Sequence, residues 1–381
     1  MKYLAYLSLA VCLPVLAGQA ERHKAWTIHN RIAGVPPTKD MLNAMEADIM
    51  RGDSDAAITK AMAHPNFTSI VLKNWFKPWS NQARSAGGQL NDFVATAVGM
   101  IRDNTPFDQI LYGDILYHAN AAAIANVPAY ARDSNNHYRE LEVREPNNWA
   151  MRLMADSQSA NNGITDSAGA ITTRAFGEAY FSAGTNRRMT RYLFINFLCR
   201  DFEQLHDVTI PDYRVRRDVE RNPGDDSRTY KNKCVGCHAG QDALGGAWAY
   251  FNFNNNQVQY TPGQVQGKMN QNSQFFPDGF RTTDDSWINT WAKGQNSSLG
   301  WDPNVPKDGN GARQIGRMLA KSKAFGECMV DRSWELLCMR KFKSTEKDIK
   351  EDLAQYFMNE TNYNMRMLFA ATLNKCVIDE N

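Results

Sequence analysis

Cys234-Val235-Gly236-Cys237-His238 is a C-x-x-C-H stretch, and it occurs once in the 381 residues of the chain. Two thiols on one helical turn can reach the two vinyl groups of a haem, and the histidine that follows then lies under the iron. The stretch therefore predicts one covalently attached haem c, anchored by Cys234 and Cys237, with His238 as the proximal iron ligand.

The same cysteine spacing also occurs in zinc sites and in thiol–disulfide redox proteins. A structural zinc site needs four ligands, usually as two closely spaced pairs, and no second Cys-x-x-Cys or His-x-x-x-His accompanies residues 234–238. No alternation of strands and helices surrounds the stretch, as a thioredoxin-like motif requires. These absences favour the haem interpretation.

Residues 1–20 have the form of a secretory signal peptide. Met1-Lys2 supplies a positive start, an apolar run follows from Leu4 to Leu16, and small residues come at Ala17, Gly18 and Ala20. We expect cleavage after Ala20 and a periplasmic, secreted or cell-surface location. Export agrees with the haem prediction, because bacterial haem c is attached outside the cytoplasm.

Charge and hydropathy exclude two classes of partner. The formal net charge is only +2, which suggests neither nucleic-acid binding nor attraction to a membrane surface. No second apolar stretch approaches the length of a membrane span, so no transmembrane segment is expected. The remaining class of partner is a redox protein of unknown identity.

Four of the seven cysteines lie outside both the predicted signal peptide, which contains Cys12, and the C-x-x-C-H stretch. Cys199, Cys328, Cys338 and Cys376 are an even number in an oxidising compartment, which predicts two disulfides in one of three connectivities. If Cys328 and Cys338 share a helix, they lie about 15 Å apart and cannot bridge each other. Cys376 is then the expected partner of one of them. Free buried thiols are the alternative.

Apolar periodicity predicts helices over most of the chain. It is clearest from Thr38 to about Ile115, from Arg187 to Arg200, and over residues 313–378. Alternation around Val258 and Tyr260 predicts a short hairpin. Three polar or irregular stretches are interpreted as an arm and surface loops: residues 21–40, 131–148 and 155–185.

Several segments together resemble a known family of exported monohaem cytochrome c-like proteins with helical flanking modules, found in planctomycetes and some proteobacteria. They are residues 42–115 with Asn74-Trp75-Phe76, the haem segment 186–254, and Phe325-Gly326-Glu327-Cys328 through Trp334 to Arg340-Lys341-Phe342. A frequent Asp-Pro-Leu-Gly in that family is here Asp242-Ala243-Leu244-Gly245. The resemblance covers most of the mature chain and implies a helical fold and an exported location; the family's biochemical role is largely unassigned.

The predicted fold class is mainly α, with a cytochrome c-like haem segment embedded between helical modules. After the signal peptide, 1–20, we expect an N-terminal helical module at 21–185, a haem c-binding segment at 186–310 and a C-terminal helical module at 311–381.

The sixth iron ligand decides the chemistry, because a second protein ligand makes an electron carrier and an open position allows small molecules to bind. Small cytochromes c supply a methionine from a loop downstream of the haem motif. Met269, in Gly267-Lys268-Met269-Asn270, is the methionine we predict as this metal ligand. Met189, Met318 and His206 are alternatives, and a gap-filling role is open to each methionine.

Two softer predictions concern the haem edge. Trp248, Tyr250 and Arg281 lie near the motif in sequence and are candidate partners of the haem propionates. Lys231 and Lys233 flank the motif and are candidates for steering an acidic redox partner.

The function we predict is electron transfer by an exported c-type monohaem cytochrome. A haem-dependent oxidoreductase, peroxidase-like or oxygen-using, with an open distal iron site is the first alternative, although no clear distal His/Arg pair is visible. A surface scaffold or binding protein that carries haem is the second alternative. Hydrolase motifs such as Gly-x-Ser-x-Gly, a Walker loop or His-Glu-x-x-His are absent.

Overall fold

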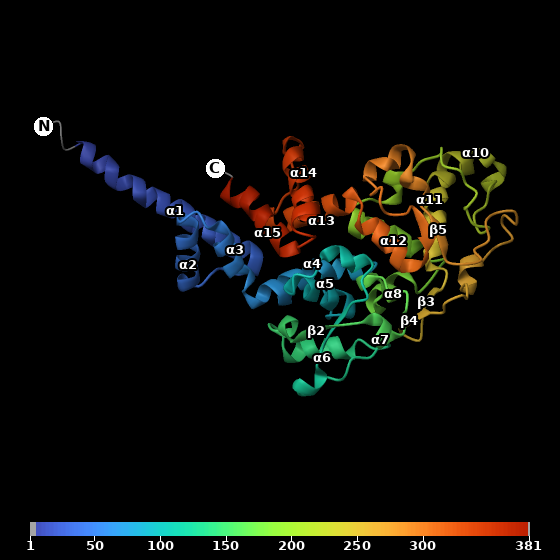
Figure 1. The fold of residues 1–381 in the computed structure, drawn as a ribbon, viewed down its shortest axis with the longest axis horizontal. Coiled ribbons are helices and arrows are strands. Elements are labelled where there is room, and N and C mark those ends of the chain that lie inside the picture. Colours follow the sequence, from blue (N-terminus) through green and yellow to red (C-terminus); the bar gives the residue numbers. More distant parts are fainter. Residues whose placement is uncertain (1–4, 380–381) are drawn as a thin grey trace.

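The computed structural model describes residues 5–379 and confirms the mainly α fold class (Figure 1). The α-helices of this part are α1 (Ala5–Ala33), α2 (Lys39–Met50), α3 (Ser54–Met62), α4 (Lys73–Phe76), α5 (Asp92–Arg102), α6 (Asn136–Arg144), α7 (Gln158–Asn162), α8 (Arg174–Tyr180), α9 (Arg187–Leu193), α10 (Ser227–Thr229), α11 (Val235–Gly245), α12 (Gly311–Ala320), α13 (Lys323–Cys338), α14 (Lys347–Gln355) and α15 (Met365–Leu373). Short 3-10 and π turns extend several of them.

Three small antiparallel sheets of two strands each complete the described structure. They pair β1 (Leu116–Ala119) with β2 (Leu153–Asp156), β3 (Phe251–Asn254) with β4 (Gln257–Tyr260), and β5 (Ser286–Ile288) with β6 (Asp308–Asn310). The β3–β4 pair is the hairpin that the sequence predicted, with Phe253 opposite Val258.

The stretch after the predicted signal peptide is helical, so the expectation of an irregular arm at 21–40 is wrong for its first part. Ala25, Ile28 and Ile32 form a fully buried stripe at helical spacing, which stabilises α1 by packing. The helix ends before Gly34, whose φ of +69° suits a helix terminus. The predicted cleavage point after Ala20 lies within α1, and residues 1–4 of the predicted signal peptide lie outside the described residues.

The helices at the two ends of the chain lie side by side, although the predicted haem segment separates them in sequence. Figure 1 shows α13–α15 against α1–α5, with α11, α12 and β5 at the other end of the molecule. Lys24 Nζ donates to the carbonyl of Ile378 at 2.9 Å, and Phe107 N donates to the carbonyl of Tyr363 at 3.0 Å. One continuous core of buried residues runs from Ala25 to Val377.

Two disulfides link the four cysteines outside the C-x-x-C-H stretch whose side chains the structure describes. Cys199 is bonded to Cys328, and Cys338 is bonded to Cys376. Cys328 and Cys338 share α13, so the prediction that Cys376 pairs with one of them is confirmed. The first bridge ties α13 to the residue after the π turn Phe194–Leu198, and the second ties it to the turn after α15.

The polar stretches 131–148 and 155–185 contain helices that the sequence analysis missed. His137, Tyr138 and Leu141 of α6 are buried, and α8 buries Phe176 and Tyr180. A few apolar side chains at helical spacing are enough to dock these short helices on the core, while their outer faces make the local composition look like loop.

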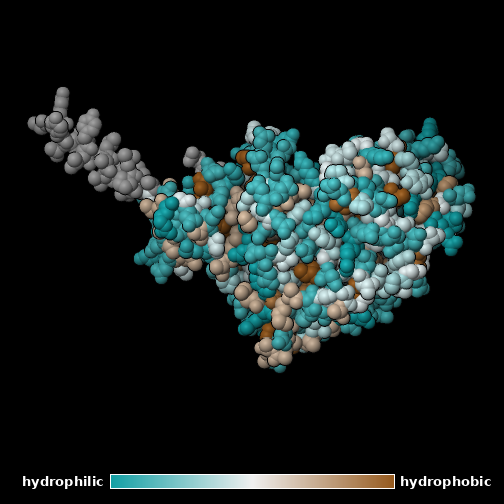
Figure 2. All heavy atoms as spheres, viewed as in Figure 1, coloured by the Kyte–Doolittle hydropathy of each residue, from teal (hydrophilic) through white to brown (hydrophobic). Residues whose placement is uncertain are grey.

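Within residues 5–379, no helix combines the length and apolar character that a membrane span needs. The face seen in Figure 2 is mainly hydrophilic, with hydrophobic residues scattered singly or in small groups.

We expect removal of the Cys338–Cys376 bridge to lower the free energy of unfolding by about 4 kcal/mol, because it closes a loop with a sequence separation of 38. Denaturant unfolding of the Cys338→Ala/Cys376→Ala variant measures the loss. Met339→Ala, at a 74% exposed neighbour, is the matched control and should change little. A loss no larger than the control's would show that the bridge does not stabilise the fold.

Candidate functional site

The C-x-x-C-H stretch occupies the first turn of α11, which begins directly after Cys234. At 3.6 residues per turn, Cys234, Cys237 and His238 lie on one face of this helix. Both cysteines are half-buried and free, whereas the four other cysteines with described side chains are in disulfides. The structure therefore presents two unpaired thiols and an imidazole on the same helical face.

The opposite face of α11 is packed against the protein through two glycines. A Cβ on Gly236 would lie 2.5 Å from Nε2 of His206, and one on Gly240 would lie 2.0 Å from Cε2 of Trp291. Side chains at these positions would push the helix away from its support. Because Gly236 and Gly240 carry no side chains, α11 can lie against His206 and Trp291, and its cysteine-bearing face is directed away from these two residues.

A carboxylate one turn further along the same helix lies within ion-pair distance of His238, whose Nδ1 has no hydrogen-bond partner among the described residues. This Nδ1 lies 3.5 Å from Oδ2 of Asp242, and the His238 side chain is 27% exposed. Metal-binding histidines commonly direct the second ring nitrogen at a carboxylate, which orients the ring and makes it a better ligand. This arrangement leaves Nε2 of His238 as the nitrogen available to iron.

Asp242 is the centre of a buried ion network. Arg187, from α9, donates to both carboxylate oxygens, at 2.6 and 2.8 Å, and the backbone N of Arg216 donates at 3.0 Å. Burial alone would raise the pKa of Asp242, but the charges of Arg187 and Arg216 hold it well below its ordinary value. Asp242 is therefore a fixed negative charge beside the imidazole of His238.

Arg216 is a buried cation whose hydrogen-bonding capacity is only partly used. Its Nη1 donates to the carbonyl of Thr185 at 2.8 Å, while Nε and Nη2 have no hydrogen-bond partner. Burial lowers its pKa to about 10, with Asp242 opposing that effect. Its Nη2 lies 3.2 Å from where a Cβ on Gly245 would stand, two turns beyond His238 on the same face of α11.

The side chains along α11 can be compared with those that a haem c binds. Two free thiols, an oriented imidazole and an unsatisfied buried guanidinium stand along one face of α11. A haem c requires thiols for its vinyl groups and a histidine for its iron, and its propionates favour cationic partners. The residues present therefore fit the group.

Met269 contacts the ion network of Asp242 through Arg216. It is buried in the 3-10 turn Gly267–Asn270, and its Sδ lies 3.8 Å from Nη1 of Arg216. The structure thus joins His238, Asp242, Arg216 and Met269 by successive contacts, but directs the sulfur at the guanidinium. Met269 as the sixth iron ligand stays a prediction.

The alternative ligands are placed less favourably. His206 packs against Gly236, on the face of α11 opposite His238. Met189 is fully buried in α9, and Met318 accepts a hydrogen bond from Asn289 at 3.4 Å.

The predicted propionate partners differ in their availability. Trp248 Nε1 already donates to Oγ1 of Thr190 at 3.0 Å, and Trp248 is fully buried. Arg281 is exposed and Tyr250 is half-buried. Lys231 and Lys233 are exposed shortly before Cys234, and their role in steering a partner stays a prediction.

Sequence reasoning missed the residues that support the site. The i, i+4 relation between His238 and Asp242 is visible in the sequence and could have indicated the carboxylate. Arg187 and Arg216 are 55 and 26 residues from Asp242, and only the folded chain brings them to it.

The chain matches no family model, no curated protein and no solved structure. The class of the site therefore rests on the chemistry of its own residues. Two free cysteines and an adjacent histidine are the residues that covalent attachment of a c-type haem requires.

We expect Asp242→Asn to destabilise the protein by about 3 to 5 kcal/mol, because it leaves the buried Arg216 without a carboxylate and the half-buried Arg187 with Asp218 alone. Denaturant unfolding measures the loss. Asp226→Asn, which removes a solvent-exposed pair with Arg228, is the matched control and should have little effect. Equal effects of the two substitutions would contradict the importance of the buried network.

Proposed function

We propose that this protein is an exported monohaem c-type cytochrome that transfers electrons through a haem attached to Cys234 and Cys237. The observation that carries the proposal is the division of the cysteines. Four of those with described side chains form two disulfides, and the two left free are the pair of the C-x-x-C-H stretch. In an exported protein, free thiols in this motif can form thioether bonds to the vinyl groups of a haem.

Each residue of the site has a role in this proposal. Cys234 and Cys237 anchor the porphyrin, His238 binds the iron through Nε2, and Asp242 holds the ring from behind. Arg216 receives a propionate with its unsatisfied nitrogens. The haem, when bound, supplies a reversible one-electron change at iron. The negative charge of Asp242 makes His238 a stronger donor and favours the oxidised state.

The location and partner follow the same proposal. The signal-peptide pattern at residues 1–20 and the two disulfides agree with a periplasmic or cell-surface protein. Lys231 and Lys233 stand exposed next to the attachment turn and would steer an acidic redox protein towards it. The resemblance to exported monohaem cytochrome c-like proteins supports this view of the chain.

A haem-dependent oxidoreductase with an open iron site is the second candidate. One observation favours it: Arg216 engages the sulfur of Met269, and His206 packs behind α11. If the haem-loaded protein keeps this arrangement, neither residue reaches the iron, and a small molecule can bind there.

The visible spectrum of the purified protein, with and without carbon monoxide, separates the two candidates. An electron carrier with Met269 on the iron gives a low-spin spectrum that carbon monoxide does not change. Met269→Leu, which keeps the volume but removes the sulfur, should then open the iron to the gas. Met45→Leu, at a fully buried methionine of α2 that is not among the candidate ligands, is the matched control and should leave the spectrum unchanged. A wild-type spectrum that shifts with the gas contradicts electron transfer through a six-coordinate iron and supports the oxidoreductase.

A further inference from the structure

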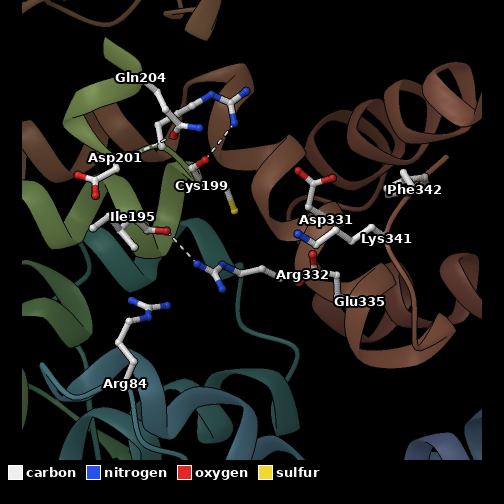
Figure 3. Close-up of a pocket in the computed structure, with 11 residues that line it drawn as sticks. Arg84, Ile195, Cys199, Asp201, Gln204, Asp331, Arg332, Glu335, Lys341 and Phe342 are labelled. Atoms are coloured by element: carbon white, nitrogen blue, oxygen red, sulfur yellow. Dashed lines mark hydrogen bonds between the residues drawn. The ribbon is translucent and has the colours of Figure 1, made fainter. Parts of the chain in front are cut away.

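A second site candidate lies between α13 and the segment that follows α9. The cavity there has a volume of about 680 Å³ and reaches the Cys199–Cys328 bridge at Cys199 (Figure 3). Four basic side chains line it: Arg84, Arg200, Arg332 and Lys341. A volume of this size suits a small-molecule ligand.

None of these four cations makes an ion pair in the described structure. Arg332 donates to the carbonyls of Asn196 and Ile195 at 3.0 and 2.8 Å, and Arg84 donates to Oδ1 of Asn196 at 2.8 Å. Arg200 donates to its neighbouring carbonyl of Cys199 at 3.0 Å. These neutral partners fix the guanidinium groups without cancelling their charge.

The acidic residues of the cavity do not balance the basic ones. Asp201 is paired with Arg191 at 2.7 Å, and Asp331 is paired with Lys350 at 2.7 Å. Glu335 is the one lining carboxylate without a described ion pair. The cavity therefore keeps an excess of positive charge.

Arg84 and Arg332 stand close enough to repel each other. Figure 3 shows both guanidinium groups directed at the same open space. Burial, and then the charge of Arg84, lower the pKa of Arg332 to about 10. Arg332 is also held over the ring of Trp79 at 4.5 Å, so it cannot easily turn away. An anion between the two groups would remove the repulsion.

We propose that this cavity binds a small polyanion that carries at least two carboxylate or phosphate groups. The hydrogen bonds to Asn196 and Ile195 use Nε and Nη2 of Arg332 and Nη1 of Arg84, which leaves Nη1 of Arg332 and Nε and Nη2 of Arg84 as donors for the oxygens of either group. The residues that line the cavity do not include Cys234, Cys237 or His238. The two sites are neighbours, because the 3-10 turn Phe202–Leu205 contacts both: Phe202 O accepts from the Cys237 thiol at 3.4 Å, and Gln204 lines the cavity. The inference does not depend on the presence of haem.

Calorimetric titration of the full-length exported protein at low ionic strength tests this site, with citrate and inorganic pyrophosphate as separate probes. We expect saturable binding of at least one probe. Arg84→Gln and Lys341→Gln, both at exposed positions, should each weaken it about tenfold. Glu335→Gln should strengthen it, because it removes the unpaired negative charge. Binding of citrate alone assigns a carboxylate ligand, and binding of pyrophosphate alone assigns a phosphate ligand.

Lys347→Gln is the matched control, since this lysine is 77% exposed and does not line the cavity. It should leave the dissociation constant unchanged. The proposal is overturned if neither probe binds, or if Lys347→Gln weakens binding as much as Arg84→Gln and Lys341→Gln do.

Discussion

The buried carboxylate of Asp242 is the interaction on which the proposed haem site depends. It binds Arg187 from α9 and Arg216 from the loop between α9 and α10, and it lies beside the ring of His238. A buried charge is tolerated only when opposite charges and hydrogen bonds compensate it, so the three elements are held in one arrangement. The same charge that fixes these elements also fixes the imidazole that would bind iron. Structural support and the placement of the proposed iron ligand therefore depend on the same carboxylate.

The rest of the molecule fixes the position of α11, which carries Asp242 and His238. Gly236 and Gly240 let α11 lie directly on His206 and Trp291, which determines the direction of the cysteine-bearing face. The helices before and after this segment pack on one another. The Cys199–Cys328 disulfide ties α13 to the segment after α9, and the Cys338–Cys376 disulfide ties the end of α13 to the turn after α15. A large helical body thus supports a single short helix, and the basic cavity beside Cys199 gives that body a binding capacity separate from the haem.

Local patterns in the sequence predicted some of this well. The mainly α class, the β3–β4 hairpin and the pairing of Cys376 with a cysteine of α13 follow from periodicity and from the reach of a disulfide. The helix at residues 21–33 was missed, because its buried stripe of Ala25, Ile28 and Ile32 is sparse among polar residues. Arg216 and the surroundings of Met269 depend on contacts between residues far apart in the sequence. No local pattern encodes such contacts, so the carboxylate–arginine network emerged only from the fold.

Intact-protein mass spectrometry of the exported chain, followed by mapping of the peptide that contains residues 234–238, tests the central claim most directly. We predict the mass of the chain plus one haem, bound covalently to Cys234 and Cys237, and its loss in the Cys234→Ala/Cys237→Ala variant. A chain produced with an active haem-attachment system, yet carrying no covalent haem and showing free or mutually bonded thiols at these positions, would contradict the account.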